Sequence, residues 1–447
     1  MKRFAIMPAL AALASVTLMS ACANIYVLRP TENKVSISTS ASTDPYKAQV
    51  VGIQWLNPLQ RRDYSTEWQL LWTLGLSKPN KDDDLVRTDP ASFSTLQAIG
   101  SIVSGVNGEE TFPGFHRKYF ESLIVPFHDN YFSYSTYFYN AHNVKEKDTW
   151  RELAGIHVEY ALPSEKLDPL EARSFAVNFI RRTFAIGNPN FPTAWTRDAV
   201  PDVHVTTGGE NIGFKSLSAA LDYLQTHPSE TAWAMNWDAP NFPPKDDQLN
   251  ENMVLLVLAG PDYKTEREPL AWIGYPATHN AADFEKKSDL PPRVMQAWKA
   301  TLAQAVQNAG KEPIDIGYVI HDAHNTHADS GERIANLAHI STKEIAEFDF
   351  VKQSFNTSAL LGDMGAGSAL TNVALGIAYA NHIGKNVLVA GTTDLENPAA
   401  VVIVPPAKVR PIDHDKPWFR ARSENNAYLM WWGIRQDTEF HMQGYSK

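Results

Sequence analysis

Segments with strand-type and helix-type patterns alternate along most of this 447-residue chain. The apolar run at 253–259 predicts a buried strand, and 171–184 has the apolar spacing of a helix. Such alternation predicts an α/β fold built from layers of sheet and helix. We expect further strands at 49–53, 131–139, 204–207, 232–236, 270–275, 314–320, 386–390 and 399–404, and further helices at 67–74, 216–224, 293–308 and 367–380. The strand at 270–275 is expected to pair with the one at 253–259.

The composition is that of a globular protein and excludes some classes of function. Apolar residues make up 44% and charged residues 20% of the chain. The formal net charge of −10 argues against nucleic-acid binding, because phosphate groups bind to basic surfaces. Twelve tryptophans and sixteen tyrosines favour buried anchors and protein–protein surfaces. Beyond the N-terminal segment, no apolar run approaches the roughly 20 residues that span a bilayer.

The N-terminus has the pattern of a bacterial secretory signal. Lys2 and Arg3 precede an apolar stretch at 4–19, which ends in Ser20-Ala21-Cys22. A cysteine after small residues resembles the lipobox of bacterial lipoproteins, which implies that Cys22 is lipidated. We therefore expect a lipoprotein signal peptide at 1–21 and a lipidated, Ser/Thr-rich tether at 22–46. An ordinary signal peptide with a chance cysteine, or an uncleaved anchor, remains the alternative. Membrane contact is expected only through this N-terminal lipid or signal.

Five segments of the body resemble the thiolase fold, most closely the β-ketoacyl synthases. Each segment stands where those enzymes have, in order, the opening strand, the nucleophile turn, the mid-chain hairpin, the strand before the catalytic histidine loop and the Gly-rich helix start. The segments are 50–59 (VVGIQWLNPL), 203–224, 251–275, 314–327 (IDIGYVIHDAHNTH) and 360–380. The resemblance implies a thiolase-like αβαβα architecture with two pseudo-repeated halves, at 47–240 and 241–447.

The catalytic positions that the resemblance identifies have mostly lost their chemistry. The nucleophilic cysteine position falls at Gly208 or Gly209, and the single cysteine of the chain lies far away in the N-terminal segment. One catalytic histidine is retained as His324, the second histidine position is Asp363, and the lysine position is Ser358. Because a thiolate is the acyl acceptor in these enzymes, condensing activity is not expected. His324 and Asp363 could still form an acid–base pair, or could be satisfied polar groups in a vestigial cleft.

Other patterns for chemistry are weaker. His321, His324 and His327, with Asp322 and Asp329, form a dense cluster of metal-ligating residue types. Residues three apart on a strand-to-loop path point in different directions, so we predict no metal site there. The chain has neither a Gly-x-Ser-x-Gly elbow nor a Gly-x-Gly-x-x-Gly loop. We therefore expect no metal and no cofactor.

The string QVVGIQWLNPLQRRDYSTEWQLLWTLG at 49–75, with the C-terminal half, resembles the type VI lipase adapter family. This resemblance implies a non-enzymatic adaptor or chaperone that binds a phospholipase toxin and targets it to the spike of a type VI secretion machine. Its partners would be the lipase effector and the spike protein. Trp55, Trp68 and Trp72 lie in this string and are either core residues or partner-binding anchors. The protein could form a homodimer, as thiolase-fold proteins usually do, or a hetero-complex with its partner could replace that dimer.

The N-terminal signal and the adaptor role predict different locations. The signal places the body on the periplasmic side of the bacterial envelope as a membrane-anchored lipoprotein, whereas toxin loading is expected in the cytoplasm. Two other functions stay open at this stage. One is an envelope lipoprotein that binds an acyl or other apolar ligand in the vestigial cleft, and the other is an enzyme that uses His324 and Asp363.

Overall fold

The computed structural model describes residues 45–56, 66–78, 112–132, 156–184, 200–239, 252–264, 268–323 and 329–414. All of them belong to one unit, Asp44–Lys447. The predicted signal peptide, Cys22, nearly all of the predicted tether and His324 lie outside the described residues. No helix in the described ranges is long and apolar enough to cross a membrane.

The strands form one mixed sheet with the order β3-β2-β4-β5-β1-β6-β11-β10-β8-β9, and β7 pairs with β11 beside this path. The strands are β1 (Ala48–Leu56), β2 (His157–Pro163), β3 (Asp202–Gly208), β4 (Thr231–Asp238), β5 (Asn252–Ala259), β6 (Ala271–Ile273), β7 (Ala277–Thr278), β8 (Ile316–His321), β9 (Ser354–Asn356), β10 (Asn386–Gly391) and β11 (Ala399–Val404).

The helices lie mostly between consecutive strands of the chain. They are α1 (Thr66–Thr73), α3 (Phe112–Phe132), α4 (Pro169–Thr183), α5 (Ile212–Thr226), α6 (Arg293–Asn308), α7 (Ser330–Glu344), α8 (Thr357–Leu361) and α9 (Ser368–Ile383), with the short 3-10 helices η3 (Ala281–Asp283), η4 (Pro313–Asp315) and η5 (Gly365–Gly367).

Two sets of strands repeat one topology. In the first set β2 pairs in parallel with β3 and β4, and β5 joins β4 antiparallel. In the second set β8 pairs in parallel with β9 and β10, and β11 joins β10 antiparallel. Helices α5 and α9 occupy equivalent places, because each one precedes the third strand of its set. Antiparallel pairing of β1 with β6 joins the two sets into one sheet.

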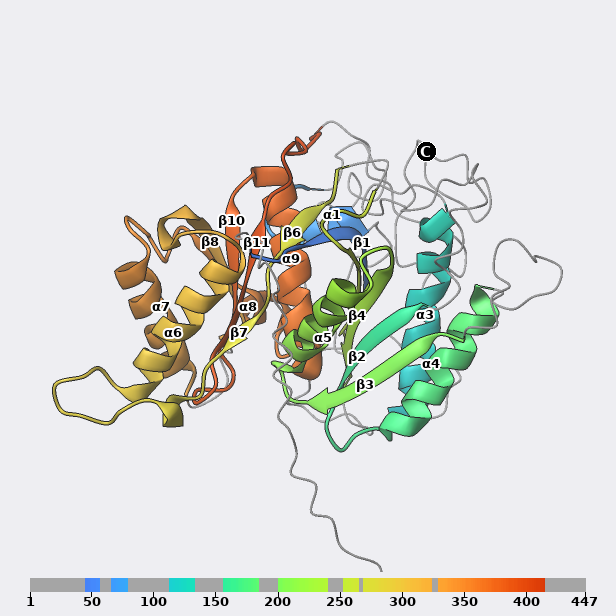
Figure 1. The fold of residues 1–447 in the computed structure, drawn as a ribbon, viewed down its shortest axis with the longest axis horizontal. Coiled ribbons are helices and arrows are strands. Elements are labelled where there is room, and N and C mark those ends of the chain that lie inside the picture. Colours follow the sequence, from blue (N-terminus) through green and yellow to red (C-terminus); the bar gives the residue numbers. More distant parts are fainter. Residues whose placement is uncertain are drawn as a thin grey trace, which may run out of the picture. The chain divides into compact units, whose positions relative to one another are not determined.

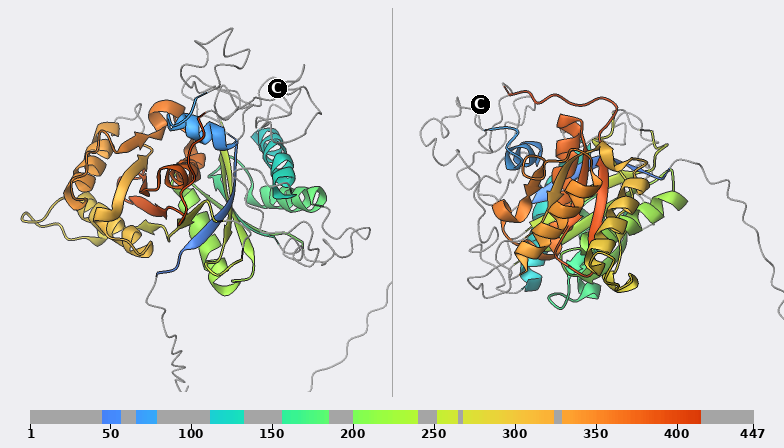
Figure 2. Two further views of the ribbon diagram at one scale, coloured as in Figure 1. Left: turned by 90° about the horizontal axis from the view of Figure 1, so that it is seen from above. Right: turned by 90° about the vertical axis from the view of Figure 1, so that its left-hand side faces the viewer.

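The buried side chains divide into three main clusters, and these define the layers. Alternate residues of a strand point to opposite faces, so Trp233 of β4 packs toward α3 and α4 while Ala234 packs toward α5 and α9. In the second set Val387 of β10 faces the same central helices, and Leu388 faces α6 and α7. The layers therefore run from α3 and α4, through the first set of strands, to α5 and α9, and then through the second set of strands to α6 and α7 (Figure 1). The left view of Figure 2, seen from above, also shows α6 and α7 on the side opposite to α3 and α4.

Helix α9 is buried nearly all round, because both sets of strands and α5 pack on it. Its sequence is accordingly apolar on every side rather than on one stripe. Gly384 ends it in the left-handed conformation (φ 75°), which a glycine adopts without steric cost. At the periphery, α4 begins with the Asp168 side chain accepting from the Leu170 amide and with Pro169 in the first turn.

The structure confirms most of the predicted elements and corrects one pairing. The helix at 293–308 and the strand at 399–404 have the predicted bounds. The predicted strand at 270–275 is shorter, and it pairs with β1 and β11 instead of with β5. The reason is that β1, from the start of the body, lies between β5 and β6. Of the predicted strand at 131–139, the first two residues end helix α3, and the rest lie outside the described residues.

Candidate functional site

The predicted nucleophile position lies where β3 ends and α5 begins. Gly208 is the last residue of β3, and the Ile212 amide that opens α5 donates to the Gly209 carbonyl (3.0 Å). A Cβ atom on Gly208 would lie 2.7 Å from Ile212 Cδ1, whereas the space around Gly209 is open. Neither position carries a side chain, so the start of α5 presents only backbone at the predicted nucleophile position.

The same turn packs against the end of β10. A Cβ atom on Gly391 would overlap with Asn211 Oδ1 and lie 2.9 Å from Phe214 Cε2, so the missing side chain of Gly391 allows this approach. The Asn211 side-chain amide is buried, and neither its oxygen nor its nitrogen has a hydrogen-bond partner within the described ranges. Buried polar atoms without partners are rare in folded proteins, so we include Asn211 among the candidate site residues at this junction.

Asp322 follows β8 and brings a buried carboxyl group to the junction. Its Oδ1 accepts hydrogen bonds from the Thr392 amide (2.7 Å) and from Thr392 Oγ1 (2.9 Å), while Oδ2 has no partner among the residues that the structure describes. Burial raises the pKa of Asp322 to about 6, and the nearby Glu210 carboxylate acts in the same direction. Glu210 belongs to the turn before α5, so Asp322 lies within electrostatic range of that turn.

The segment after β8 is held in place by residues from β9 and α8. Asn356 Nδ2 donates to the Ala323 carbonyl (2.9 Å), and Asn356 Oδ1 accepts from the Ala359 amide (3.3 Å) at the start of α8. Ser358, which occupies the predicted lysine position, donates from Oγ to the Asp322 carbonyl (3.0 Å). Ser358 thus fixes the backbone that carries the buried carboxyl group.

Asp363 lies in the loop between α8 and η5. Its Oδ1 accepts from the Gly365 amide (2.9 Å), which turns the chain into η5. Ala366 of η5 packs with Ile212 of α5 and Ala161 of β2 in a small buried cluster. This contact brings the Asp363 loop to the start of α5.

A buried ion pair anchors the same loop from the end of β4. Asp238 Oδ2 accepts from the Ala366 amide (3.0 Å), and Asp238 Oδ1 contacts Lys166 Nζ (2.8 Å). Burial raises the pKa of Asp238, although Lys166 and the Ala366 amide oppose this shift. We call the junction formed by Gly208, Gly209, Asn211, Asp322 and Asp363 the carboxyl-edge site, because β3, β8 and β10 all end there.

The predicted site residues therefore fall into two groups. Gly208, Gly209, Ser358 and Asp363 come together through the contacts of α5, Asp322 and η5. His324 lies outside the described residues, so its pairing with Asp363 stays a prediction. Sequence reasoning missed Asn211 as a member, because its place depends on the long-range approach of Gly391.

The remaining residues of the predicted histidine cluster point to separate partners. His321 is buried, stacks on Phe350 (5.6 Å between ring centroids), and has its pKa lowered to about 4 by burial. Asp322 binds Thr392, and Asp329 Oδ2 accepts from Arg333 Nε (3.0 Å). His324 and His327 lie outside the described residues. Three groups close in sequence thus make three different contacts.

The three tryptophans that the sequence offered as partner anchors are core residues. Trp55, Trp68 and Trp72 are 1%, 0% and 5% exposed. Trp68 and Trp72 pack on each other with ring centroids 4.5 Å apart, and Trp55 Nε1 donates to Asn252 Oδ1 (3.0 Å). Burial of the indole rings supports the core alternative, and a role as partner anchors stays a prediction.

One cluster that the sequence did not point to lies at the other end of β2 and β3. His157, Asp202 and His204 place one potential ligand atom each within 4.8 Å of one another. The signal was present as His-x-Glu at 157–159 and Asp-x-His at 202–204, since residues two apart on a strand share a face. This signal could be recognised only once the register of β2 and β3 was known.

Comparison with known proteins gives one family match, which covers part of the chain. Residues 271–406 match the family model described as "Type VI lipase adapter protein Tla3, C-terminal". The matched stretch begins with β6 and ends two residues after β11, so it covers the second set of strands. No curated protein matches the chain.

Solved structures with similar chains include ketosynthases at low identity. An oxazolomycin ketosynthase domain of Streptomyces albus JA3453 is 12% identical, with a TM-score of 0.48 over 83% of this chain and 98% of that one. The ishigamide ketosynthase/chain length factor is 16% identical, with a TM-score of 0.47 over 80% and 99% of the two chains. A variant of OleA from Xanthomonas campestris is 11% identical, with a TM-score of 0.45 over 81% and 100%.

Proposed function

Residues 271–406 match the C-terminal family of the type VI lipase adapter Tla3, and from this premise we propose that the protein is a non-enzymatic adaptor. In this proposal it binds a lipase effector of the type VI secretion system and delivers that effector to the secretion spike. The family match carries the proposal. An adaptor needs a stable, pre-formed surface and no reacting groups, which agrees with the glycines at the predicted nucleophile position.

We further propose that the fold is thiolase-like. Two observations support this: the repeated strand topology, and the five layers with α5 and α9 in the centre. In such a fold the carboxyl-edge site is the place of the lost active site. Its residues keep their structural contacts, through Ser358 to the Asp322 carbonyl and through Asp363 to the Gly365 amide, and glycines occupy the predicted nucleophile position.

The carboxyl-edge site argues against the alternative function, in which the protein binds an acyl or other apolar ligand in the vestigial cleft. The buried groups that lack partners there are polar, namely the Asn211 amide and one oxygen of Asp322, as far as the described residues show. An acyl chain could not hydrogen-bond to these atoms and would leave their desolvation uncompensated. The adaptor is therefore the better supported function.

Formation of a complex tests the proposal. The full chain is mixed with a purified type VI lipase effector from the same bacterium, and complex formation is followed by size-exclusion chromatography with light scattering. We expect one co-eluting complex, and we expect Asp363→Ala to form it as well as the wild type. An enzyme using His324 and Asp363 would instead show an activity that His324→Ala and Asp363→Ala abolish while the fold persists. Separate elution of the two proteins at micromolar concentration would contradict the adaptor.

Localisation is a separate proposal that depends on Cys22. If Cys22 is the lipidation site, the wild type incorporates an alkyne-labelled fatty acid in bacterial cells and sediments with membranes, whereas Cys22→Ser loses the label completely. The physical reason is that the sulfur is the acceptor of the diacylglyceryl group and each buried methylene of its chains adds about 0.8 kcal/mol of membrane affinity. An unlabelled wild type in the soluble fraction would contradict lipidation of Cys22.

A further inference from the structure

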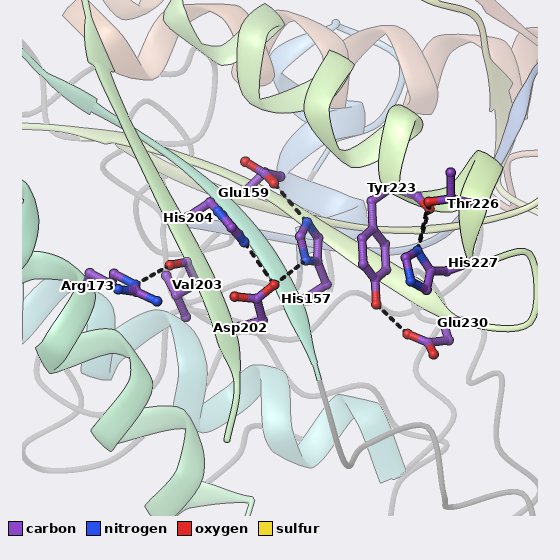
Figure 3. Close-up of polar contacts among 10 residues, drawn as sticks. All are labelled: His157, Glu159, Arg173, Asp202, Val203, His204, Tyr223, Thr226, His227 and Glu230. Carbon is purple, nitrogen blue, oxygen red and sulfur yellow. Dashed lines mark hydrogen bonds and ion pairs between the residues drawn. The ribbon is translucent and has the colours of Figure 1, made fainter. Parts of the chain in front are cut away.

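The most unusual cluster of titratable side chains outside the carboxyl-edge site lies at the beginnings of β2 and β3. The two strands are parallel, with His157 opposite Asp202 and Glu159 opposite His204. Asp202 Oδ2 lies 3.1 Å from His157 Nδ1 and 2.8 Å from His204 Nε2 (Figure 3). Two imidazoles therefore face the same carboxylate oxygen.

His157 stands between two carboxylates. Its Nε2 lies 2.8 Å from Glu159 Oε1, and its Nδ1 faces Asp202. If the neutral ring donates its one N–H to Glu159, the lone pair on Nδ1 points at a negatively charged oxygen, which is unfavourable. A metal ion held by Nδ1 and Asp202 would accept this lone pair and balance the negative charge of the carboxylate. The arrangement of a carboxylate, a histidine and a ligand atom is the one that orients metal-bound imidazoles.

The surroundings hold these groups in place. The His157 ring stacks on Tyr223 of α5, with centroids 3.7 Å apart and planes within 4°. The other face of Tyr223 stacks on His227 at 4.1 Å. Arg173 Nε donates to the Val203 carbonyl (2.7 Å) and so fixes β3 between the two exposed ligand residues. Buried, stacked and hydrogen-bonded side chains of this kind are pre-organised for binding.

The accessibility of the cluster suits an ion that enters from water. The side chains of His157 and Glu159 are 5% and 9% exposed, whereas those of Asp202 and His204 are 49% and 52% exposed. The three ligand atoms lie within 4.8 Å of one another, so only small side-chain movements would bring each of them to about 2.0–2.2 Å from a central Zn²⁺. Two histidines and one carboxylate leave one coordination position for water.

We propose that His157 Nδ1, Asp202 and His204 Nε2 form a divalent transition-metal site, with Zn²⁺ as its ion and Glu159 as the positioning residue that orients His157. This inference is independent of the adaptor function, because none of these residues belongs to the carboxyl-edge site or to residues 271–406. It also replaces the sequence-based expectation that the chain has no metal site.

The test is a zinc titration of the full chain, stripped with a chelator, freed of any histidine tag and monitored by competition with a chromophoric zinc indicator. We expect the wild type to bind one equivalent of Zn²⁺. His204→Ala, at a half-exposed position, should lower the affinity at least about 100-fold, and Glu159→Gln should lower it about 10- to 100-fold. His227→Ala is the matched control, since His227 belongs to the same stack without being a ligand, and its affinity should equal that of the wild type.

A second measurement keeps the test clear if a variant loses stability. Co²⁺ is added to the wild type and to His204→Ala after circular dichroism has shown that both are folded, and the visible spectrum is recorded. Intense d–d bands in the wild type alone support the site. Equal zinc affinity in the wild type and His204→Ala, or a folded wild type that binds no zinc, would overturn the proposal and leave hydrogen bonds alone as the explanation of the cluster.

Discussion

Trp55→Ala is expected to destabilise the fold by about 3–5 kcal/mol, because a fully buried indole is replaced by a cavity. Trp55 is 1% exposed and packs in the central cluster with α9 and α5. Its Nε1 is also the donor to Asn252 Oδ1, a side chain buried between β5 and α9. Loss of this donor leaves a buried acceptor with less hydrogen bonding, which adds to the cost. The denaturant midpoint, followed by far-UV circular dichroism, measures the effect.

Trp55→Phe is the matched control for this substitution. It retains most of the ring volume and removes the N–H donor, so its loss of stability should be clearly smaller than that of Trp55→Ala. If Trp55 were a partner anchor instead, Trp55→Ala would leave the midpoint unchanged and weaken the binding of a partner. An unchanged midpoint would therefore contradict the placement of Trp55 in the core.

The stability of Asp322→Asn relative to that of the wild type is expected to increase as the pH rises, because the wild type loses stability. The folded Asp322 has a pKa of about 6, above its value of 3.8 in an unfolded chain, so between these values the folded state retains a proton that the unfolded state has lost. The wild type loses stability over this pH range, by about 3 kcal/mol in total for a shift of about two units. Below about pH 4 both states are protonated, and above about pH 6 the loss is complete.

The measurement is the difference in unfolding free energy between Asp322→Asn and the wild type, at pH 4.5 and at pH 7.5. Other carboxyl groups titrate equally in both proteins and cancel in this difference. Asparagine retains an oxygen that can accept from the Thr392 amide and hydroxyl, so the main change is in the titration, and the difference should grow by about 2 kcal/mol from pH 4.5 to pH 7.5. A difference that does not grow with pH would show that Asp322 is paired or solvated at neutral pH.

Much of the fold could be predicted from local pattern. Helix α6 and strand β11 have clear signals, an amphipathic run and a continuous apolar run, and their predicted bounds agree with the structure. The pairing of β6 could not be predicted in this way. The usual expectation is that consecutive strands pair, whereas here β1 comes from some 200 residues earlier and takes the position beside β5.

The carboxyl-edge site was partly predictable, because it depends on residue types at the ends of predicted elements. The glycines at 208 and 209 and Asp363 fell at such ends, and the structure brings their loops together. The cluster of His157, Asp202 and His204 was not found, because its members lie on two strands whose register is a long-range property. A single-residue shift between β2 and β3 would put His157 opposite Val203 instead of Asp202 and separate the ligand groups.

The tryptophans show the limit of composition as evidence. Many aromatic residues favour either a core or an interface, and the two alternatives are not distinguished by count or by local spacing. Trp68 is fully buried because α1 packs on α9, a contact between segments about 300 residues apart. Only the tertiary structure decides between the alternatives.

Direct binding of the lipase effector tests the central claim. Isothermal titration calorimetry of the purified full chain with a folded, active type VI lipase effector from the same bacterium should give saturable binding with a dissociation constant in the micromolar range or tighter and a stoichiometry of one adaptor to one lipase. Such an affinity corresponds to at least about 8 kcal/mol of binding free energy. No saturable binding, with both proteins folded and the lipase active, would contradict the adaptor function.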